Sequence, residues 1–412
     1  MANAINYPQS LKQVSVTLIL FDLDNTLLGN EMNDFIPAYL QALAGRMAQV
    51  SDPAVLIKTL LSATRQMIEN KSPEKTLEEK FDDAFYPPLN LIRQDVQSII
   101  DDFYKEDFPK LERLTQRLPD AVKVVHQIID MGDQAAVATN PLFPLTAIQQ
   151  RLDWAGLPAD QTPFVMIPSY ETFHFAKPDP AYYAEFLAQL GWPKLPVIMV
   201  GNDIDSDINA ARKLELPVFW INKGTTIWND PAPPPPHGEI SDFIPWLAGL
   251  PHKVLSTQFT SQVSLLSVLR STPAALDTLC HQKNVELGKH PAQDEWSVGE
   301  VLCHLRDVEM EVNLPRIKTV INDNNPFLAG KDTDPWAEER RYSQQDGLQA
   351  LADFIHTRLE AIKLLDDLPA ESWNRQARHA IFGPTHLREL VTIITGHDIL
   401  HVQQVYQVFK SQ

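Results

Sequence analysis

The sequence predicts an α/β protein with a Rossmann-like parallel sheet and an inserted helical cap, followed by an all-α four-helix bundle domain. Three observations lead to this fold class. Apolar runs of strand length alternate with helical patterns over the first 250 or so residues, as expected of a parallel, doubly wound sheet. A long helical stretch interrupts this alternation after the first run. Beyond about residue 255 the pattern is helical only.

Length, composition and charge limit the class of protein. A chain of 412 residues exceeds one ordinary hydrophobic core, so two or three domains are expected. The formal net charge of −18 argues against sequence-independent nucleic-acid binding, which depends on many basic contacts to phosphates. No apolar run could span a bilayer, and none resembles a secretory signal. With only Cys280 and Cys303, both expected as small buried residues, we predict a cytoplasmic protein without nucleic-acid or membrane partners.

Five apolar, β-branched runs are predicted as strands. They are Val14–Phe21, Ala135–Ala138, Phe164–Ile167, Val197–Val200 and Val218–Ile221. Helical patterns separate several of them: one covers Pro119–Met131 and stops at Gly132, and another covers Pro178–Leu190 and stops at Gly191. Glycine is the preferred residue just past a helix end.

The stretch from about residue 31 to 118 is predicted as an all-helical insertion. Within it Asp52 is an N-cap candidate, and Pro53 suits the first helical turn. Ligands of doubly wound sheets bind at the carboxyl ends of the strands. Because the insertion directly follows the first strand, it should form a cap above that edge.

A proline tract, DPAPPPPH at Asp230–His237, predicts extended backbone. Glu239–Leu250 is expected to be a short closing helix, and the domain boundary to lie near Pro251–Ser256. Four long helical segments follow, without a predicted strand, at about 258–282, 296–322, 344–367 and 386–410. Four helices of this length indicate an up-and-down bundle, which we expect to fold independently of the first part.

Acidic residues follow two of the predicted strands. Asp22 and Asp24 come directly after the first strand, and Asp203 and Asp207 come after the strand that ends at Val200. Carboxylates gathered at one sheet edge are costly unless a cation lies between them. Oxygen ligands of this kind suit magnesium. Thr139, at the end of another strand, can donate a hydroxyl.

Lys177, in the proline-rich turn FAKPDP, can neutralise phosphate charge. The ordered motifs together resemble the haloacid dehalogenase superfamily over residues 14–250. They are Asp22-Leu23-Asp24-Asn25-Thr26, Thr139-Asn140, Lys177-Pro178 and Gly201-Asn202-Asp203 with Asp207. The resemblance implies a catalytic core at 14–30 and 119–250 and a helical cap at 31–118.

The resemblance also implies a role for each motif residue. Asp22 would be the nucleophile that forms an aspartyl-phosphate, and Asp24 the general acid and base. Asp22, the Asp24 carbonyl and Asp203 would hold Mg²⁺, with Asp207 orienting its water shell or Lys177. Thr139 and Lys177 would bind the transferring phosphoryl group.

One position departs from the superfamily pattern, which commonly has aspartate directly after the glycine where this chain has Asn202. We therefore take Asp203 as the magnesium neighbour. Asn202 would replace it in the usual register, with weaker binding. Since metal-independent haloacid dehalogenases lack an acid at the position of Asp24, its presence favours phosphate over halide chemistry. The predicted substrate is a small phosphorylated metabolite, and a phosphomutase remains an alternative.

Three histidines in the second half form a second candidate site. His397 and His401 are one helical turn apart on one face. His304 belongs to an earlier apolar helix that could face them, and three imidazoles suit Zn²⁺ or Ni²⁺. The competing interpretation is that they are buried, hydrogen-bonded and metal-free.

Residues 255–412 resemble the DinB-like four-helix bundles, a family that includes thiol-dependent isomerases and transferases. The match is carried by Trp296-Ser297-Val298-Gly299 through His304, and by Gly396 through Gln404. It implies that His304, His397 and His401 are metal ligands. Three roles stay open for this half: a metal-binding accompaniment to the phosphatase, a second enzyme with a thiol-linked reaction, or a non-catalytic module for docking or homodimerisation.

Overall fold

The computed structural model describes residues 16–222, 224, 226–250, 258–282, 286–292 and 295–411. The first two residues of the predicted strand Val14–Phe21 and the predicted domain boundary Pro251–Ser256 therefore lie outside the described residues. No helix within these ranges is both long and apolar enough to cross a membrane.

A five-stranded parallel sheet forms the centre of the first part, with strand order β4-β1-β5-β6-β7. Its strands are β1 (Leu18–Phe21), β4 (Gln134–Val137), β5 (Val197–Gly201), β6 (Val218–Ile221) and β7 (His237–Gly238). Four of the five predicted runs are thus strands. All the residues of β1, β5 and β6 are buried, as expected of strands covered on both faces.

The prediction of a strand at Phe164–Ile167 is wrong. This segment is irregular, although Val165 N donates to Ala135 O at 2.9 Å and Met166 O accepts from Val137 N at 3.0 Å. It follows the outer edge of β4 without a regular ladder, because Pro163 and Pro168 on either side cannot donate backbone hydrogen bonds. The short β7, which begins where the proline tract ends at His237, was not predicted.

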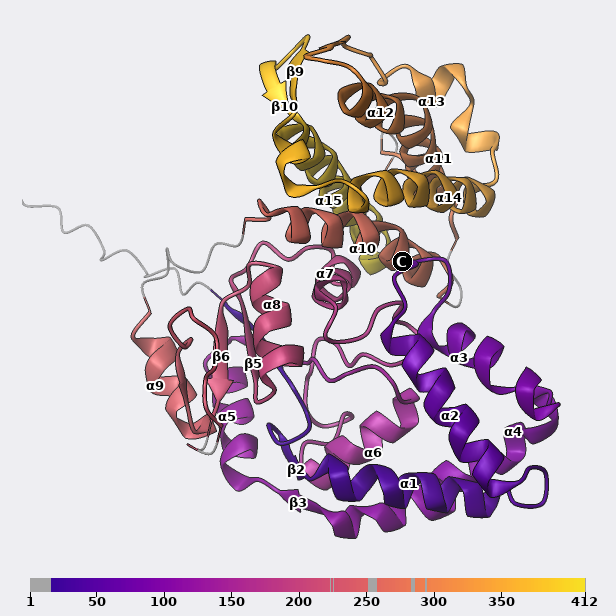
Figure 1. The fold of residues 1–412 in the computed structure, drawn as a ribbon, viewed down its shortest axis with the longest axis vertical. Coiled ribbons are helices and arrows are strands. Elements are labelled where there is room, and N and C mark those ends of the chain that lie inside the picture. The colour runs from indigo at the N-terminus through magenta and orange to yellow at the C-terminus, as the bar shows by residue number, and fades with distance from the viewer. Residues whose placement is uncertain are drawn as a thin grey trace, which may run out of the picture.

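Helices cover both faces of the sheet (Figure 1). They are α5 (Pro119–Asp130), α6 (Leu145–Ala155), α7 (Pro180–Gln189), α8 (Ala210–Lys213) and α9 (Phe243–Ala248). Side chains of α5, α6 and α9 share one core with alternate residues of β1, such as Ile19 and Phe21. Side chains of α7 and α8 share another core with Leu18 and Leu20.

The insertion is helical and forms a cap beside the sheet, the dark ribbons at the lower right of Figure 1. It contains α1 (Met32–Arg46), α2 (Pro53–Ile68), α3 (Leu77–Phe85) and α4 (Arg93–Asp102). Asp52 caps α2, accepting from Ala54 N and Val55 N at 3.0 Å each. A two-stranded antiparallel pair, β2 (Leu28–Asn30) with β3 (Thr115–Arg117), closes the insertion where it enters and leaves the core, and was not predicted.

The second part is the predicted bundle of four long helical segments. They are α10 (Gln262–Cys280), α11 (Val298–Val308) continued by a π-helical turn into α12 (Leu314–Asn322), α14 (Gly347–Asp366) and α15 (Leu387–Ser411). A short helix α13 (Trp336–Glu339) lies in a connection. A small sheet of β8 (Phe327–Leu328), β9 (Gln376–His379) and β10 (Gly383–His386) corrects the prediction that this part has no strand.

The expected up-and-down order of the helices is wrong. Helices α10 and α11 each pack against α14 and α15. The first two long helices, α10 and α11, therefore lie diagonally across the bundle, as do α14 and α15, whereas α11 and α14 lie side by side. An up-and-down bundle needs short loops between neighbours. Here the connections 281–297 and 367–386 are long enough to pass from one corner of the bundle to the opposite one.

The bundle packs on the first part through α10, which lies along α7 (Figure 1). One continuous hydrophobic core includes residues of the sheet, of α7 and of the bundle. Polar contacts cross the same boundary: Thr278 Oγ1 donates to Thr172 O at 2.8 Å, and Gln403 Nε2 donates to Trp192 O at 3.0 Å. This shared core argues against the expectation that the two parts fold independently.

Candidate functional site

The carboxyl edge of the sheet brings together residues from three of the four predicted motifs. Asp22 directly follows β1 and is 7% exposed. Lys177 Nζ lies 2.9 Å from Asp22 Oδ1 and 2.6 Å from Asp207 Oδ1. The other oxygen of Asp207 accepts from Asp203 N at 2.9 Å. Asp207 therefore holds Lys177, one of the two roles considered for it, and both of its oxygens already have protein partners.

Burial controls the charge of this group. Desolvation and, to a smaller extent, the neighbouring Asp207 raise the pKa of Asp22, whereas Lys177 lowers it, and the net result is a pKa of about 7. Burial also raises the pKa of Asp207, against the opposing effect of Lys177. Two buried carboxylates thus share one ammonium group. This excess of negative charge on hard oxygen atoms fits a divalent cation such as magnesium beside Asp22.

Asp24, two residues on, has a different environment. Asn30 Nδ2 donates to Asp24 Oδ1 at 2.7 Å, and Arg151 Nη2 from α6 donates to the same oxygen. The Arg151 side chain is 1% exposed, with its guanidinium over the Phe143 ring. No hydrogen bond from another described residue reaches Oδ2. Arg151 was missed from the sequence because it lies on a helix that carries no motif.

The two candidate magnesium neighbours in the motif after β5, Asn202 and Asp203, have different surroundings. Asn202 faces the β1 loop, since Thr26 Oγ1 donates to Asn202 Oδ1 at 3.1 Å. Asp203 is exposed, and its Oδ1 accepts from Asp205 N at 3.0 Å and Ser206 N at 2.7 Å. Asp203 therefore caps the following helical turn, while the amide of Asn202 is directed toward the site.

A backbone network holds the remaining two motif residues. Thr139 is 2% exposed, and its carbonyl accepts from Tyr182 Oη at 2.8 Å. Asn140 Oδ1 accepts from Lys177 N at 3.1 Å, so the third motif fixes the backbone of the lysine loop. The rings of Tyr182 and Tyr183 lie 5.8 and 5.9 Å from Lys177 Nζ. These contacts leave the lysine little freedom to turn away from Asp22.

The three predicted histidines of the bundle converge. His397 Nε2 lies 3.2 Å from His304 Nε2 and 3.1 Å from His401 Nε2. Among the described residues this is the only group of three or more His, Cys, Asp or Glu whose ligand atoms all lie within 4.8 Å. Ligands of a tetrahedral zinc ion at 2.0–2.1 Å would be about 3.4 Å apart. Two of the three distances are therefore close to those between ligands of one metal ion, and the third nitrogen pair lies within 4.8 Å.

The protonation of the triad also suits a metal. Burial lowers the pKa of His304 and of His397 to about 3, and lowers the pKa of His401. Gln404 Oε1 lies 3.1 Å from His401 Nδ1. An amide oxygen accepts only, so Nδ1 carries the proton and Nε2 has a free lone pair. Trp296 lies with its ring parallel to that of His401, at 6.4 Å between the ring centroids.

Two family models match the chain, one in each part. The model of the haloacid dehalogenase-like hydrolase family matches residues 19–221, and that of the DinB superfamily matches residues 265–405. No curated protein matches the chain.

Solved structures with similar folds cover each part. A HAD phosphatase from Thermococcus onnurineus is 16% identical, with 58% of this chain and 100% of that chain covered and a TM-score of 0.38. A 2-haloacid dehalogenase from Pseudomonas syringae pv. Tomato DC3000 is 20% identical, with 57% of this chain and 98% of that chain covered and a TM-score of 0.41. YfiT from Bacillus subtilis is described as a probable metal-dependent hydrolase with an unusual four-helix bundle topology. It is 20% identical, with 38% of this chain and 89% of that chain covered and a TM-score of 0.34. Residues 19–221 of this chain belong to the haloacid dehalogenase-like hydrolases, and residues 265–405 belong to the DinB superfamily.

Proposed function

We propose that the first part is a magnesium-dependent phosphatase of a small phosphorylated metabolite, with Asp22 as the nucleophile. The observation that carries the proposal is the pairing of Asp22 Oδ1 with Lys177 Nζ at 2.9 Å, with a second carboxylate, Asp24, two residues away. A nucleophile, a fixed cation and an acid then occupy one sheet edge. Haloacid dehalogenation is the competing chemistry, and it does not require an acid at the position of Asp24.

The two steps of hydrolysis assign a task to each residue. Asp22 attacks phosphorus, the ester P–O bond breaks, and the leaving oxygen takes a proton from Asp24. Asp24 then removes a proton from the water that attacks the aspartyl-phosphate, which frees phosphate and restores Asp22. Lys177 and Thr139 stabilise the charge on the transferring group.

Magnesium would be held by Asp22, the backbone carbonyl of Asp24 and either Asn202 or Asp203, and when bound it neutralises charge on the phosphoryl oxygens. The positions of the last two residues favour Asn202. Both known partners of Asp24 bind Oδ1, which leaves Oδ2 for the leaving group. Arg151 and Asn30 accordingly orient the acid.

Hydrolysis of p-nitrophenyl phosphate tests the proposal. Wild type should release nitrophenol with Mg²⁺ and stop when EDTA is added, and Asp22→Asn should lose at least 10³-fold of the turnover, since a nucleophile has no substitute in the site. Asp205→Asn removes an exposed acid from the neighbouring turn and should keep its activity. Turnover in Asp22→Asn, or metal-independent chloride release from a 2-chloroalkanoic acid by wild type, would reject the phosphatase.

We also propose that His304, His397 and His401 bind one transition-metal ion, zinc or nickel. The observation that favours it is the convergence of three imidazoles, with His397 Nε2 at 3.2 Å from His304 Nε2 and 3.1 Å from His401 Nε2. Three protein ligands leave a fourth position for water or a substrate thiol, which keeps the alternative of a thiol-linked second reaction. A docking or homodimerising bundle remains the other alternative, and would need no metal.

Elemental analysis of protein purified without a histidine tag tests the metal site. Near-stoichiometric zinc or nickel should be found in wild type and lost in the His397→Ala, His401→Ala double variant. The variant His126→Ala, on α5 of the first part, serves as control and should keep its metal. Metal below about a tenth of an atom per chain after supplementation, in a folded protein, would contradict the proposal.

A further inference from the structure

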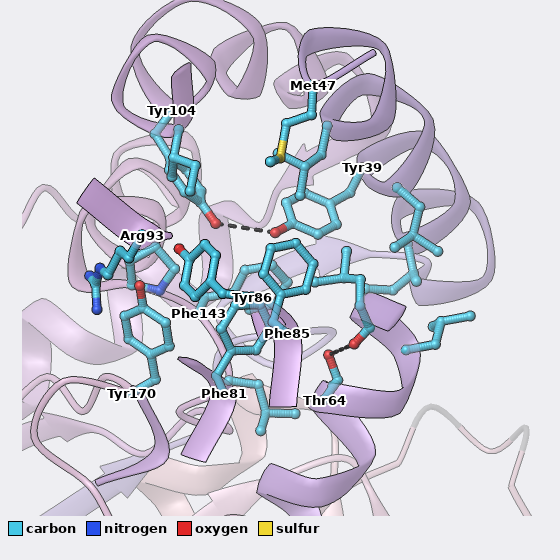
Figure 2. Close-up of a pocket in the computed structure, with 18 of the residues that line it drawn as sticks. Tyr39, Met47, Thr64, Phe81, Phe85, Tyr86, Arg93, Tyr104, Phe143 and Tyr170 are labelled. Atoms are coloured by element: carbon cyan, nitrogen blue, oxygen red, sulfur yellow. Dashed lines mark hydrogen bonds between the residues drawn. The ribbon is translucent and has the colours of Figure 1, made fainter. Parts of the chain in front are cut away.

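The cap contains a cavity of about 170 Å³ between α1, α2, α3 and the loop 142–144. Its wall is formed mainly by aromatic and aliphatic side chains, which point toward one another in Figure 2. Apolar members include Met32, Ile36, Leu43, Phe81, Phe85 and Phe143. Protein interiors rarely leave apolar space of this size unfilled, so the cavity needs an explanation.

Most polar groups in the wall are already paired with each other or with neighbours. The hydroxyls of Tyr39 and Tyr104 lie 3.1 Å apart, as drawn in Figure 2. Arg93 is bound by Glu78 and by Asp82, the latter at 2.7 Å. A sugar phosphate would bring many hydroxyls that these groups could not bind without breaking existing hydrogen bonds.

The cavity wall adjoins the side chains that hold the catalytic acid. Met32 lines the cavity, and its sulfur lies 3.6 Å from Asn30 Nδ2, which also donates to Asp24 Oδ1. Phe143 also lines the cavity, and its ring centroid is 5.5 Å from the guanidinium carbon of Arg151, the second donor to Asp24. Side chains of the cavity wall therefore contact both groups that hold the residue proposed to protonate the leaving group.

We infer that this cavity binds an apolar group of about one aromatic ring or six alkyl carbons, and that this group is the organic part of the substrate. The size follows from comparison with an engineered apolar cavity of about 150 Å³ that binds benzene. The identification as substrate rests on the phosphatase proposed above. The metabolite is then an aryl or alkyl phosphomonoester instead of a sugar phosphate.

A series of straight-chain phosphomonoesters from methyl to hexyl phosphate tests the inference. Their leaving alcohols have similar acidity, so differences in kcat/KM report on binding of the chain. For wild type, kcat/KM should rise about fourfold for each methylene that enters the cavity. Glycerol 3-phosphate, equally small but polar, should be at least tenfold poorer than propyl phosphate. A flat series, with glycerol 3-phosphate as good as hexyl phosphate, would overturn the apolar substrate and leave the phosphatase standing.

Matched variants locate the effect. Ile36→Trp places a large side chain in the cavity and should flatten the series, whereas Val55→Trp on the exposed side of α2, outside the cavity wall, should keep the wild-type slope. A slope that is the same in both variants would place the apolar site elsewhere.

Binding without turnover separates this inference from the phosphatase. Phenol, observed by saturation-transfer NMR with unlabelled protein, should bind wild type and Val55→Trp but not Ile36→Trp. If phenol binds in this way and no phosphate ester is turned over with Mg²⁺, the cavity is an apolar ligand site and the proposed function fails. If phenol does not bind wild type, the inference fails whatever the esterase activity.

Discussion

Arg358 neutralises two buried carboxylates in the bundle, Glu309 and Asp398. Its side chain is 1% exposed and donates to Glu309 at 2.7 and 2.8 Å and to Asp398 at 2.5 Å. Asp398 is adjacent to His397, and the charge of Arg358 also contributes to the lowered pKa of that histidine. The cluster therefore joins three helical segments of the bundle directly behind the histidine triad.

Loss of Arg358 should lower the free energy of unfolding. Arg358→Met leaves two buried carboxylates without a cation, and we expect the free energy of unfolding to fall by about 3–5 kcal/mol. Lys318→Met is the control, because its pair with Glu360 is about half exposed and should contribute less than about 1 kcal/mol. Urea unfolding followed by circular dichroism measures both. Equal losses in the two variants would show that Arg358 is not a structural centre of the bundle.

Helix α10 is covered on two sides, by the bundle and by the first part. Leu265 and Leu269 pack in the core of the bundle, whereas Ala274 belongs to the core shared with the sheet and α7. Ala274 is three and four residues before Asp277 and Thr278, which contact the first part. Spacings of three and four place all three residues on one helix face, so Ala274 is directed at α7.

A charge on that face should destabilise the whole chain. Ala274→Glu would bury an unpaired carboxylate at a position with no exposed surface, and we expect a loss of several kcal/mol in the free energy of unfolding. Val263→Glu, on an exposed position of the same helix, should change it by less than about 0.5 kcal/mol. Because the core is shared, the unfolding transitions of the first part and of the bundle should shift to lower urea concentration together. Separate transitions would contradict it.

At the scale of the molecule, the two parts meet in a charged contact as well as an apolar one. His174 is fully buried, three residues before Lys177, with Nδ1 at 2.8 Å from Glu185 and Nε2 at 3.2 Å from Asp277 of α10. Burial alone would lower its pKa, but Glu185 and Asp277 together raise it to about 9. The imidazolium thus links the loop that contains Lys177 to the bundle.

This contact predicts a pH dependence of stability. A histidine whose pKa is raised by folding stabilises the protein fully below its unfolded value, near 6.5, and this contribution disappears as the pH rises through about 9. The free energy of unfolding of wild type should therefore fall between pH 6.5 and 9, and His174→Gln should lack this part of the slope. His281→Gln, which removes the exposed neighbour of Asp277, should keep it. A wild-type slope unchanged in His174→Gln would contradict the assignment.

The sequence by itself determined the local features of this protein. Four of the five predicted strands, the cap helices and the four long bundle segments follow from hydrophobic period and capping residues, which act over a few positions. The catalytic candidates Asp22 and Thr139 could be found because strand ends of a parallel sheet meet at one edge, whatever the details of packing. Lys177 could be found because its turn, FAKPDP, is a local sequence feature. His397 and His401 could be paired because residues four apart lie on the same face of a helix.

Only the tertiary structure decided the contacts between distant segments. The placement of Arg151 on Asp24, of Asn202 toward the site and of Asp277 on His174 depends on how whole elements dock, and no local pattern encodes it. The diagonal order of the bundle helices and its shared core with α7 depend on long connections that permit more than one arrangement. Packing energy, summed over many buried side chains, selects among these arrangements.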